Sequence, residues 1–156
     1  MYTTLTNFDI EQFLDLSNYA TEERVSRRKG GSKSTQEFFT PYSIVKRMCD
    51  KVDESDWADP SKTFLEPCCG NFQFGCYIIW NRLQHGIDWK TAVNTLYALD
   101  LMEDNIQESK ERVVSLLDQL HIDYNKEELW KIMDNNIVCS DFFKWDFEHW
   151  RPLEEQ

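Results

Sequence analysis

Three short apolar segments, each ending in an acidic residue, constrain this chain more than any other feature of its sequence. The predicted strands are Thr63–Glu66, Thr95–Leu99 and Asn136–Cys139, and the acids are Glu66, Asp100 and Asp141. Helical spacing of apolar residues fills the sequence between them. Alternating strands and helices predict an α/β fold with a parallel sheet, in which all three acids lie on the same carboxyl edge.

The helices are predicted from apolar residues that recur every three to four positions. The predicted helical segments are 7–16, 41–52, 74–83, 104–120 and 126–134. The first begins at a cap near Asn7, and the second places Pro41 at a favourable first-turn position. Asp53–Lys62 is rich in turn-forming residues, so we expect a connection there.

The length of 156 residues and the 14% aromatic content fit one folded domain. We expect residues 1–34 to form an N-terminal helix and a flexible basic connection, and residues 35–156 to form the main domain. The connection carries the basic cluster Arg24, Arg27, Arg28, Lys29 and Lys33. Two interpretations of this cluster stay open, a solvated loop and an arm that contacts phosphates.

The formal net charge of −11 has the wrong sign for a protein held to DNA by counterion release. Any DNA contact is therefore expected to be local or to come through a partner chain. The five cysteines show no C-x-x-C pair and no zinc spacing, which predicts reduced thiols and no metal. The sequence has no apolar run of the ~20 residues that a membrane span requires, so we expect a soluble, cytoplasmic protein with no membrane contact.

The acids at the strand ends have chemistry suited to a nucleoside ligand. A carboxylate after the second strand, Asp100, can accept both ribose hydroxyls, and Gly70 lets the backbone approach a ligand closely. Asp141 can accept a hydrogen from an adenine amino group, with Phe142 as an apolar surface. The turn lacks the G-x-G-x-x-G pattern of a phosphate cradle, which disfavours a nicotinamide oxidoreductase and favours a ligand without phosphates.

Four segments, in order, resemble motifs of adenine-specific (N6) DNA methyltransferases. They are Thr35–Pro41, Phe64–Asn71, Tyr97–Leu101 and Asn136–Phe142. They look like the Phe-Tyr-Thr-Pro motif, the acid-Pro-x-Cys-Gly cofactor motif, the ribose-binding strand and the strand whose acid meets the cofactor adenine. The resemblance covers 35–143, the N-terminal, cofactor-binding part of the family. It implies a Rossmann-like methyltransferase fold with S-adenosylmethionine as cofactor.

The resemblance also implies the site. The cofactor-binding residues would be Phe39, Thr40, Pro41, Glu66, Pro67, Cys69, Gly70, Asn71, Asp100, Leu101, Asp141 and Phe142. The first three would lie against the methionine end, and the residues of the 66–71 turn would surround the amino-acid group. Asp100 would bind the ribose, and Asp141 with Phe142 the adenine. Two departures from the family pattern, Cys68 and the bulky Phe72–Phe74, predict a larger turn.

The family grips its methyl acceptor with an Asn/Asp-Pro-Pro-Tyr/Phe tetrapeptide, which this sequence lacks. We therefore expect a truncated sheet with one bare edge and a methyltransferase-like protein inactive alone. A complementary subunit, or self-association through the bare edge, would cover it. An alternative is a non-catalytic binding protein, such as a partner subunit or an acidic phage-type anti-restriction protein. No residue is assigned a catalytic role.

Overall fold

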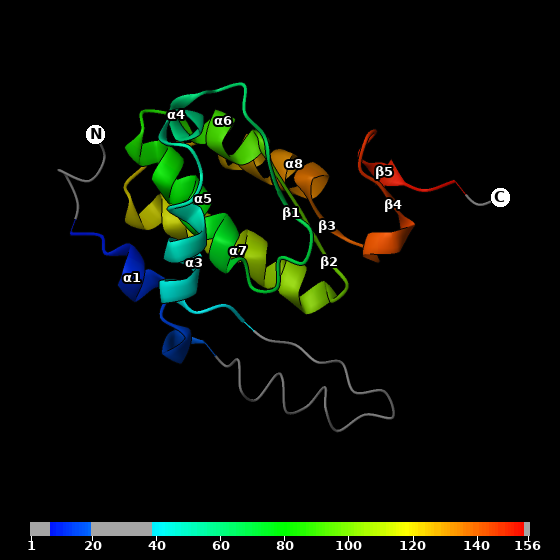
Figure 1. The fold of residues 1–156 in the computed structure, drawn as a ribbon, viewed down its shortest axis with the longest axis horizontal. Coiled ribbons are helices and arrows are strands. Elements are labelled where there is room, and N and C mark those ends of the chain that lie inside the picture. The colour runs from blue at the N-terminus through cyan, green and yellow to red at the C-terminus, as the bar shows by residue number, and fades with distance from the viewer. Residues whose placement is uncertain (1–6, 20–38, 155–156) are drawn as a thin grey trace.

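The computed structural model describes residues 7–19 and 39–154 and forms all three predicted strands (Figure 1). These are β1 (Phe64–Glu66), β2 (Leu96–Asp100) and β3 (Ile137–Cys139). All pairs are parallel, and the order is β1-β2-β3, so β2 lies in the centre. The prediction of an α/β fold with a parallel sheet and flanking helices is confirmed. The described residues leave the outer edges of β1 and β3 unpaired.

Helices connect the strands as predicted, with some differences in extent. They are α1 (Ile10–Phe13), η2 (Leu16–Asn18), α3 (Tyr42–Cys49), α4 (Glu54–Ala58), α5 (Gln73–Gln84), α6 (Trp89–Asn94), α7 (Glu103–Gln119), α8 (Lys126–Asn136) and η3 (Phe142–Lys144). The predicted cap of α1 at Asn7 was wrong, because the Asp9 carboxylate caps a single short turn. The short helix α4 lies inside the segment predicted as a connection, and α6 was not predicted. Both begin where an aspartate side chain accepts a backbone N–H.

The two faces of the sheet have different coverings. Apolar side chains from Leu96, Ala98 and Ile137 belong to the hydrophobic core formed with the helices. Alternation along β2 sends Tyr97 to the opposite face, where its ring meets the Trp150 ring edge-on at 4.9 Å. Leu65 shares this second face through its pairing with Tyr97 and remains 51% exposed. One face is therefore fully packed, and the other is partly covered.

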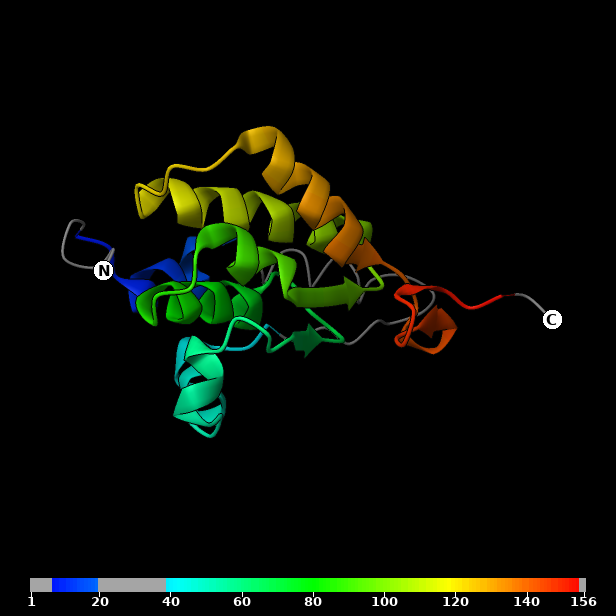
Figure 2. The ribbon, with the colours of Figure 1, turned by 90° about the horizontal axis from the view of Figure 1, so that it is seen from above.

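The C-terminal segment forms a small hairpin that sequence periodicity did not reveal. Its strands are β4 (Trp145–Asp146) and β5 (Arg151–Pro152), which pair antiparallel. Trp150 lies in the left-handed region with φ 51°, and its indole N–H donates to the Asn135 carbonyl at 2.7 Å. Figure 2 shows β1 and β2 pointing toward the side of the molecule where this hairpin lies.

The N-terminal segment packs on the main body of the protein. Ile10, Phe13 and Leu14 are buried in the common core. The Gln73 amide nitrogen at the start of α5 donates to the Leu14 carbonyl at 2.8 Å and to the Thr40 carbonyl at 2.9 Å. Residues 7–19 therefore share a core with α5. The predicted domain boundary at 34 and the basic cluster from Arg24 to Lys33 lie outside the described residues.

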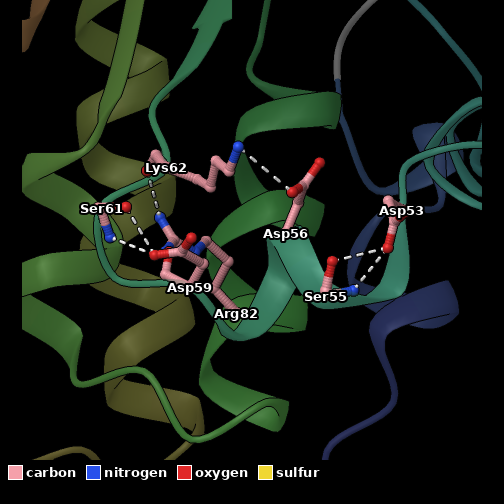
Figure 3. Close-up of polar contacts among 7 residues, drawn as sticks. All are labelled: Asp53, Ser55, Asp56, Asp59, Ser61, Lys62 and Arg82. Carbon is pink, nitrogen blue, oxygen red and sulfur yellow. Dashed lines mark hydrogen bonds and ion pairs between the residues drawn. The ribbon is translucent and has the colours of Figure 1, made fainter.

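A buried arginine, Arg82 of α5, joins α4, the turn after it and the sheet. Its guanidinium donates to the carbonyls of Trp57 at 3.4 Å, Asp59 at 2.5 Å and Lys62 at 3.1 Å, and to the Thr95 hydroxyl at 2.6 Å. Figure 3 shows Arg82 beside the turn that leads into β1. The side chain is fully buried and satisfies three backbone carbonyls, one in the last turn of α4 and two in the turn after it.

No helix in the described parts of the chain has both the length and the apolar character needed to cross a membrane.

Replacing Arg82 with leucine is predicted to destabilise the fold by about 3–5 kcal/mol, because three carbonyls lose their buried donor. Urea unfolding followed by circular dichroism measures this loss. The matched control is Lys62→Met, which removes only an exposed ion pair with Asp56 at 3.6 Å and is expected to cost less than about 1 kcal/mol. Equal losses in the two variants would contradict the assigned role of Arg82.

Candidate functional site

The three predicted acids lie together at the carboxyl edge of the sheet. Glu66 ends β1, Asp100 ends β2, and Asp141 follows β3 as the cap of η3. Backbone hydrogen bonds bring the loops after both outer strands to the end of β2. Cys69 N–H donates to the Leu99 carbonyl at 2.9 Å, and Ser140 N–H donates to the Asp100 carbonyl at 3.0 Å. The predicted juxtaposition is confirmed, because all three strands run in the same direction.

The loop between β1 and α5 has a shape that depends on two glycines. Gly70 has φ 53°, and a Cβ there would lie 3.3 Å from the Phe39 ring. Phe72 is fully buried with φ 73°, and a Cβ on Gly75 would lie 2.4 Å from its ring. The bulky Phe72 is therefore accommodated by a missing side chain one turn later. A non-glycine residue with a positive φ, such as Phe72, has a sparsely populated backbone conformation, and such residues are typical of functional loops.

A cavity of about 100 Å³ lies at this loop. Its lining residues are Phe39, Thr40, Glu66, Cys68, Cys69, Gly70, Asn71, Gln73 and Phe74. Six of the predicted site residues therefore line one cavity. Sequence analysis missed Cys68, Gln73 and Phe74 as lining residues, although a polar residue in the first turn after such a loop is a usable signal.

The other predicted residues lie outside this cavity. They are Pro41, Pro67, Asp100, Leu101, Asp141 and Phe142. Pro41 caps α3 rather than lining the cavity. Leu101 is 60% exposed and Phe142 is 41% exposed, on the loops that follow β2 and β3. The site thus has an enclosed part beside β1 and an open apolar part beyond β2 and β3.

Buried polar atoms in the cavity wall lack hydrogen-bond partners among the described residues. Asn71 is 1% exposed, and neither its amide oxygen nor its amide nitrogen has a partner. The amide oxygen of Gln73 also has no hydrogen-bond partner among the described residues. An unpaired buried polar group costs about 1–3 kcal/mol, so a molecule that paired with Asn71 or Gln73 would remove that cost.

Asp100 makes three internal hydrogen bonds. Its Oδ2 accepts Gly70 N–H at 2.9 Å, and its Oδ1 accepts Met102 N–H at 2.9 Å and the Asn105 amide at 3.1 Å. A carboxylate offers about four acceptor positions. One position on Oδ2 therefore remains for a ligand, while the others hold the loop.

The environment of Glu66 favours its protonated form. The pKa of Glu66 is raised from 4.5 to about 7, chiefly by burial; a hydrogen bond from the Cys68 N–H lowers it, and the nearby Asp100 charge adds to the rise. Burial also raises the pKa of the Cys69 thiol strongly, which disfavours the thiolate that a nucleophile requires. The described residues contain no group of three or more side chains placed to hold a metal ion.

The raised pKa of Glu66 predicts how stability depends on pH. The folded state holds this proton more tightly than the unfolded chain, so the wild type loses stability as pH rises from about 4.5 to 7. The Gln side chain in Glu66→Gln cannot ionise. The free energy of unfolding of this variant, relative to that of the wild type, is therefore expected to increase by about 1–3 kcal/mol from acidic to mildly alkaline pH.

Urea unfolding at about pH 5 and about pH 8 measures this gain, and Glu127→Gln, an exposed residue of α8, serves as the control with no pH-dependent gain. A constant difference between Glu66→Gln and wild type at both values would contradict the raised pKa.

No protein-family model matches the chain, and no curated protein and no solved structure matches it either.

Proposed function

We propose that this chain binds S-adenosylmethionine at the carboxyl edge of its sheet, as the cofactor-binding part of a DNA adenine-N6 methyltransferase-like protein. The observation that carries the proposal is the cavity after β1, which is lined by both Glu66 and Asn71, a buried residue whose amide has no partner among the described residues. The ends of β2 and β3 continue the same edge with Asp100 and Asp141.

The strand order supports a ligand at this place. In doubly wound folds with the order 3-2-1-4-5-6, ligands bind outside the carboxyl ends of the strands, beside the first strand. The order β1-β2-β3 in this chain is the same as one half of that sheet, and the cavity lies at the end of β1. The location fits the rule, although the fold alone does not define the ligand.

The chemistry of the edge fits the three parts of the cofactor. The small cavity would take the amino-acid end, which brings donors and acceptors for Asn71. The remaining acceptor position of Asp100 would bind a ribose hydroxyl. The exposed side chains of Leu101 and Phe142 would contact the adenine, and Asp141 would accept its amino hydrogen. Among the residues that the structure describes, no Lys or Arg lines the cavity, which supports a ligand without phosphates.

The sequence has no Asn/Asp-Pro-Pro-Tyr/Phe tetrapeptide, so the proposal gives these residues the cofactor side of the reaction and not the acceptor side. S-adenosylmethionine supplies the methyl group, and the residues of this chain hold and orient it. The Phe64 N–H donates to the carbonyl of Thr95, the residue before β2. Successive residues of a strand direct their N–H and C=O groups to opposite sides, so those of Leu65 face away from β2. A strand of the partner would pair with Leu65 at this edge.

A second candidate is a binding protein without catalysis, such as a partner subunit or an acidic anti-restriction protein. The net charge of −11 favours it, because an acidic surface competes with DNA for basic proteins. In that case the unpaired edge at β1 would be the contact surface, and the cavity would be unused.

Calorimetric titration of the full chain with S-adenosylmethionine is expected to give a dissociation constant in the micromolar range. Asn71→Leu keeps the side-chain volume and removes amide atoms that have no described partner, so it is expected to leave the fold intact. The same change is expected to weaken binding at least about tenfold, because one lost hydrogen bond to a ligand costs about 1.4 kcal/mol or more.

The matched control is Asn94→Leu on the exposed side of α6, which is expected to bind as the wild type does. Absence of binding by folded wild-type protein would instead favour the non-catalytic candidate.

A further inference from the structure

The loop after β1 is bound to the N-terminal segment, residues 7–19, at two of the residues that line the cavity. These residues are Asn71 and Gln73. The Gln73 amide nitrogen donates to the Leu14 carbonyl at 2.8 Å. The Asn71 carbonyl accepts a hydrogen bond from the side chain of Arg112 in α7. Neither Leu14 nor Arg112 belongs to the cavity lining, so the loop is held in place from outside the cavity.

Arg112 contacts the cavity loop and the N-terminal segment at the same time. Its side chain is buried, and the guanidinium carbon lies 4.2 Å from the centre of the Tyr19 ring and 5.3 Å from that of Phe13. Both distances are within the range of cation–π contacts. Its guanidinium nitrogens donate to the Asn71 carbonyl and, at 3.5 Å, to the Phe13 carbonyl. One side chain therefore joins the segment to the loop.

Tyr19 fixes the end of the segment at this arginine. Its hydroxyl donates to the Phe13 carbonyl at 2.8 Å, which holds the Tyr19 ring where the guanidinium contacts it. Neither Tyr19 nor Phe13 lines the cavity. An effect of Tyr19 on a ligand in the cavity must therefore be transmitted through other residues, and Arg112 touches both Tyr19 and Asn71.

We propose that Arg112 is a positioning residue, which connects the packing of residues 7–19 to Asn71, so that this packing and the binding of S-adenosylmethionine in the cavity strengthen each other. This inference rests on the proposed function and adds to it a means of regulating the same site. A ligand that requires one conformation of the loop favours every contact that holds the loop in that conformation. The effect is reciprocal, so the bound ligand also stabilises the packed segment.

Calorimetric titration of the full chain with S-adenosylmethionine tests this role through two variants of Tyr19. Tyr19→Leu removes the ring that contacts the guanidinium and is expected to weaken binding about fivefold. Tyr19→Phe keeps the ring and loses only the hydroxyl donor, so its dissociation constant is expected to stay within about twofold of the wild-type value. Recovery of affinity in the phenylalanine variant would assign the effect to the contact between ring and guanidinium.

The matched control is Tyr124→Leu, which separates positioning from a general loss of stability. Tyr124 also bonds to α7, because its hydroxyl donates to Asp118 at 2.7 Å, and its ring meets the Trp89 ring at 6.1 Å. None of these three residues lines the cavity. The control loses the same ring and hydroxyl as Tyr19→Leu, and it is expected to lose stability in urea while its affinity for S-adenosylmethionine stays unchanged.

A double-mutant cycle tests whether the effect of Tyr19 passes through Asn71. Asn71→Leu already removes the amide that Arg112 positions, so adding Tyr19→Leu to it is expected to cause no further loss of affinity. Losses that multiply, each variant weakening binding by its own factor, would contradict the assigned route.

Amide hydrogen exchange of the wild type measures the reciprocal effect. The Leu14 N–H donates to the Ile10 carbonyl at 3.0 Å inside the segment, so its exchange reports how firmly the segment is packed. Saturation with S-adenosylmethionine is expected to slow the exchange of this amide.

The outcomes separate this inference from the proposed function. Equal affinities of the wild type and Tyr19→Leu would overturn the inference and leave the proposed function standing. Equal losses of affinity in Tyr19→Leu and Tyr124→Leu, or exchange of the Leu14 amide that ligand leaves unchanged, would overturn it in the same way. No binding by the folded wild type would overturn the proposed function and this inference together. The exchange measurement uses the wild type, so it does not depend on how well a variant folds.

Discussion

The carboxyl end of β2 holds the candidate site together. The Leu99 and Asp100 carbonyls accept N–H groups from the loops after β1 and β3, and the Asp100 carboxylate accepts Gly70 N–H from the first loop. The same carboxylate caps the turn into α7 through Met102 N–H. One residue therefore positions three loops that come from different parts of the sequence. The Glu66 cavity and the exposed Leu101 surface both depend on this arrangement.

Two buried arginines also hold loops around the sheet in place. Arg82 satisfies carbonyls around the turn before β1, and Arg112 stacks on Tyr19 at 4.2 Å while it donates to the Asn71 carbonyl. Both guanidinium groups donate to backbone carbonyls, so they hold the loops around the site in place.

Much of the fold was predictable because its signals are local. An apolar run that ends in an acid indicates a strand, and all three such strands formed within about a residue of the prediction. The helix α6 was missed because its six residues offer only Ala92 and Val93 as buried apolar positions. The hairpin after η3 was missed because each of its strands is only two residues long, and because Trp150 packs on Tyr97 more than fifty residues away in sequence.

The sequence by itself determined that three acids would share one edge, because parallel strands place their carboxyl ends on the same side of a sheet. Only the tertiary structure decided how those acids are used. Gly70 and Asp100 are thirty residues apart in sequence. Their hydrogen bond occupies one acceptor position of the carboxylate that was predicted to bind ribose. The unpaired amide of Asn71 and the raised pKa of Glu66 likewise depend on the described residues that surround them in space. Hydrogen bonding and burial depend on which groups come close together in space, and no periodicity along the chain encodes that.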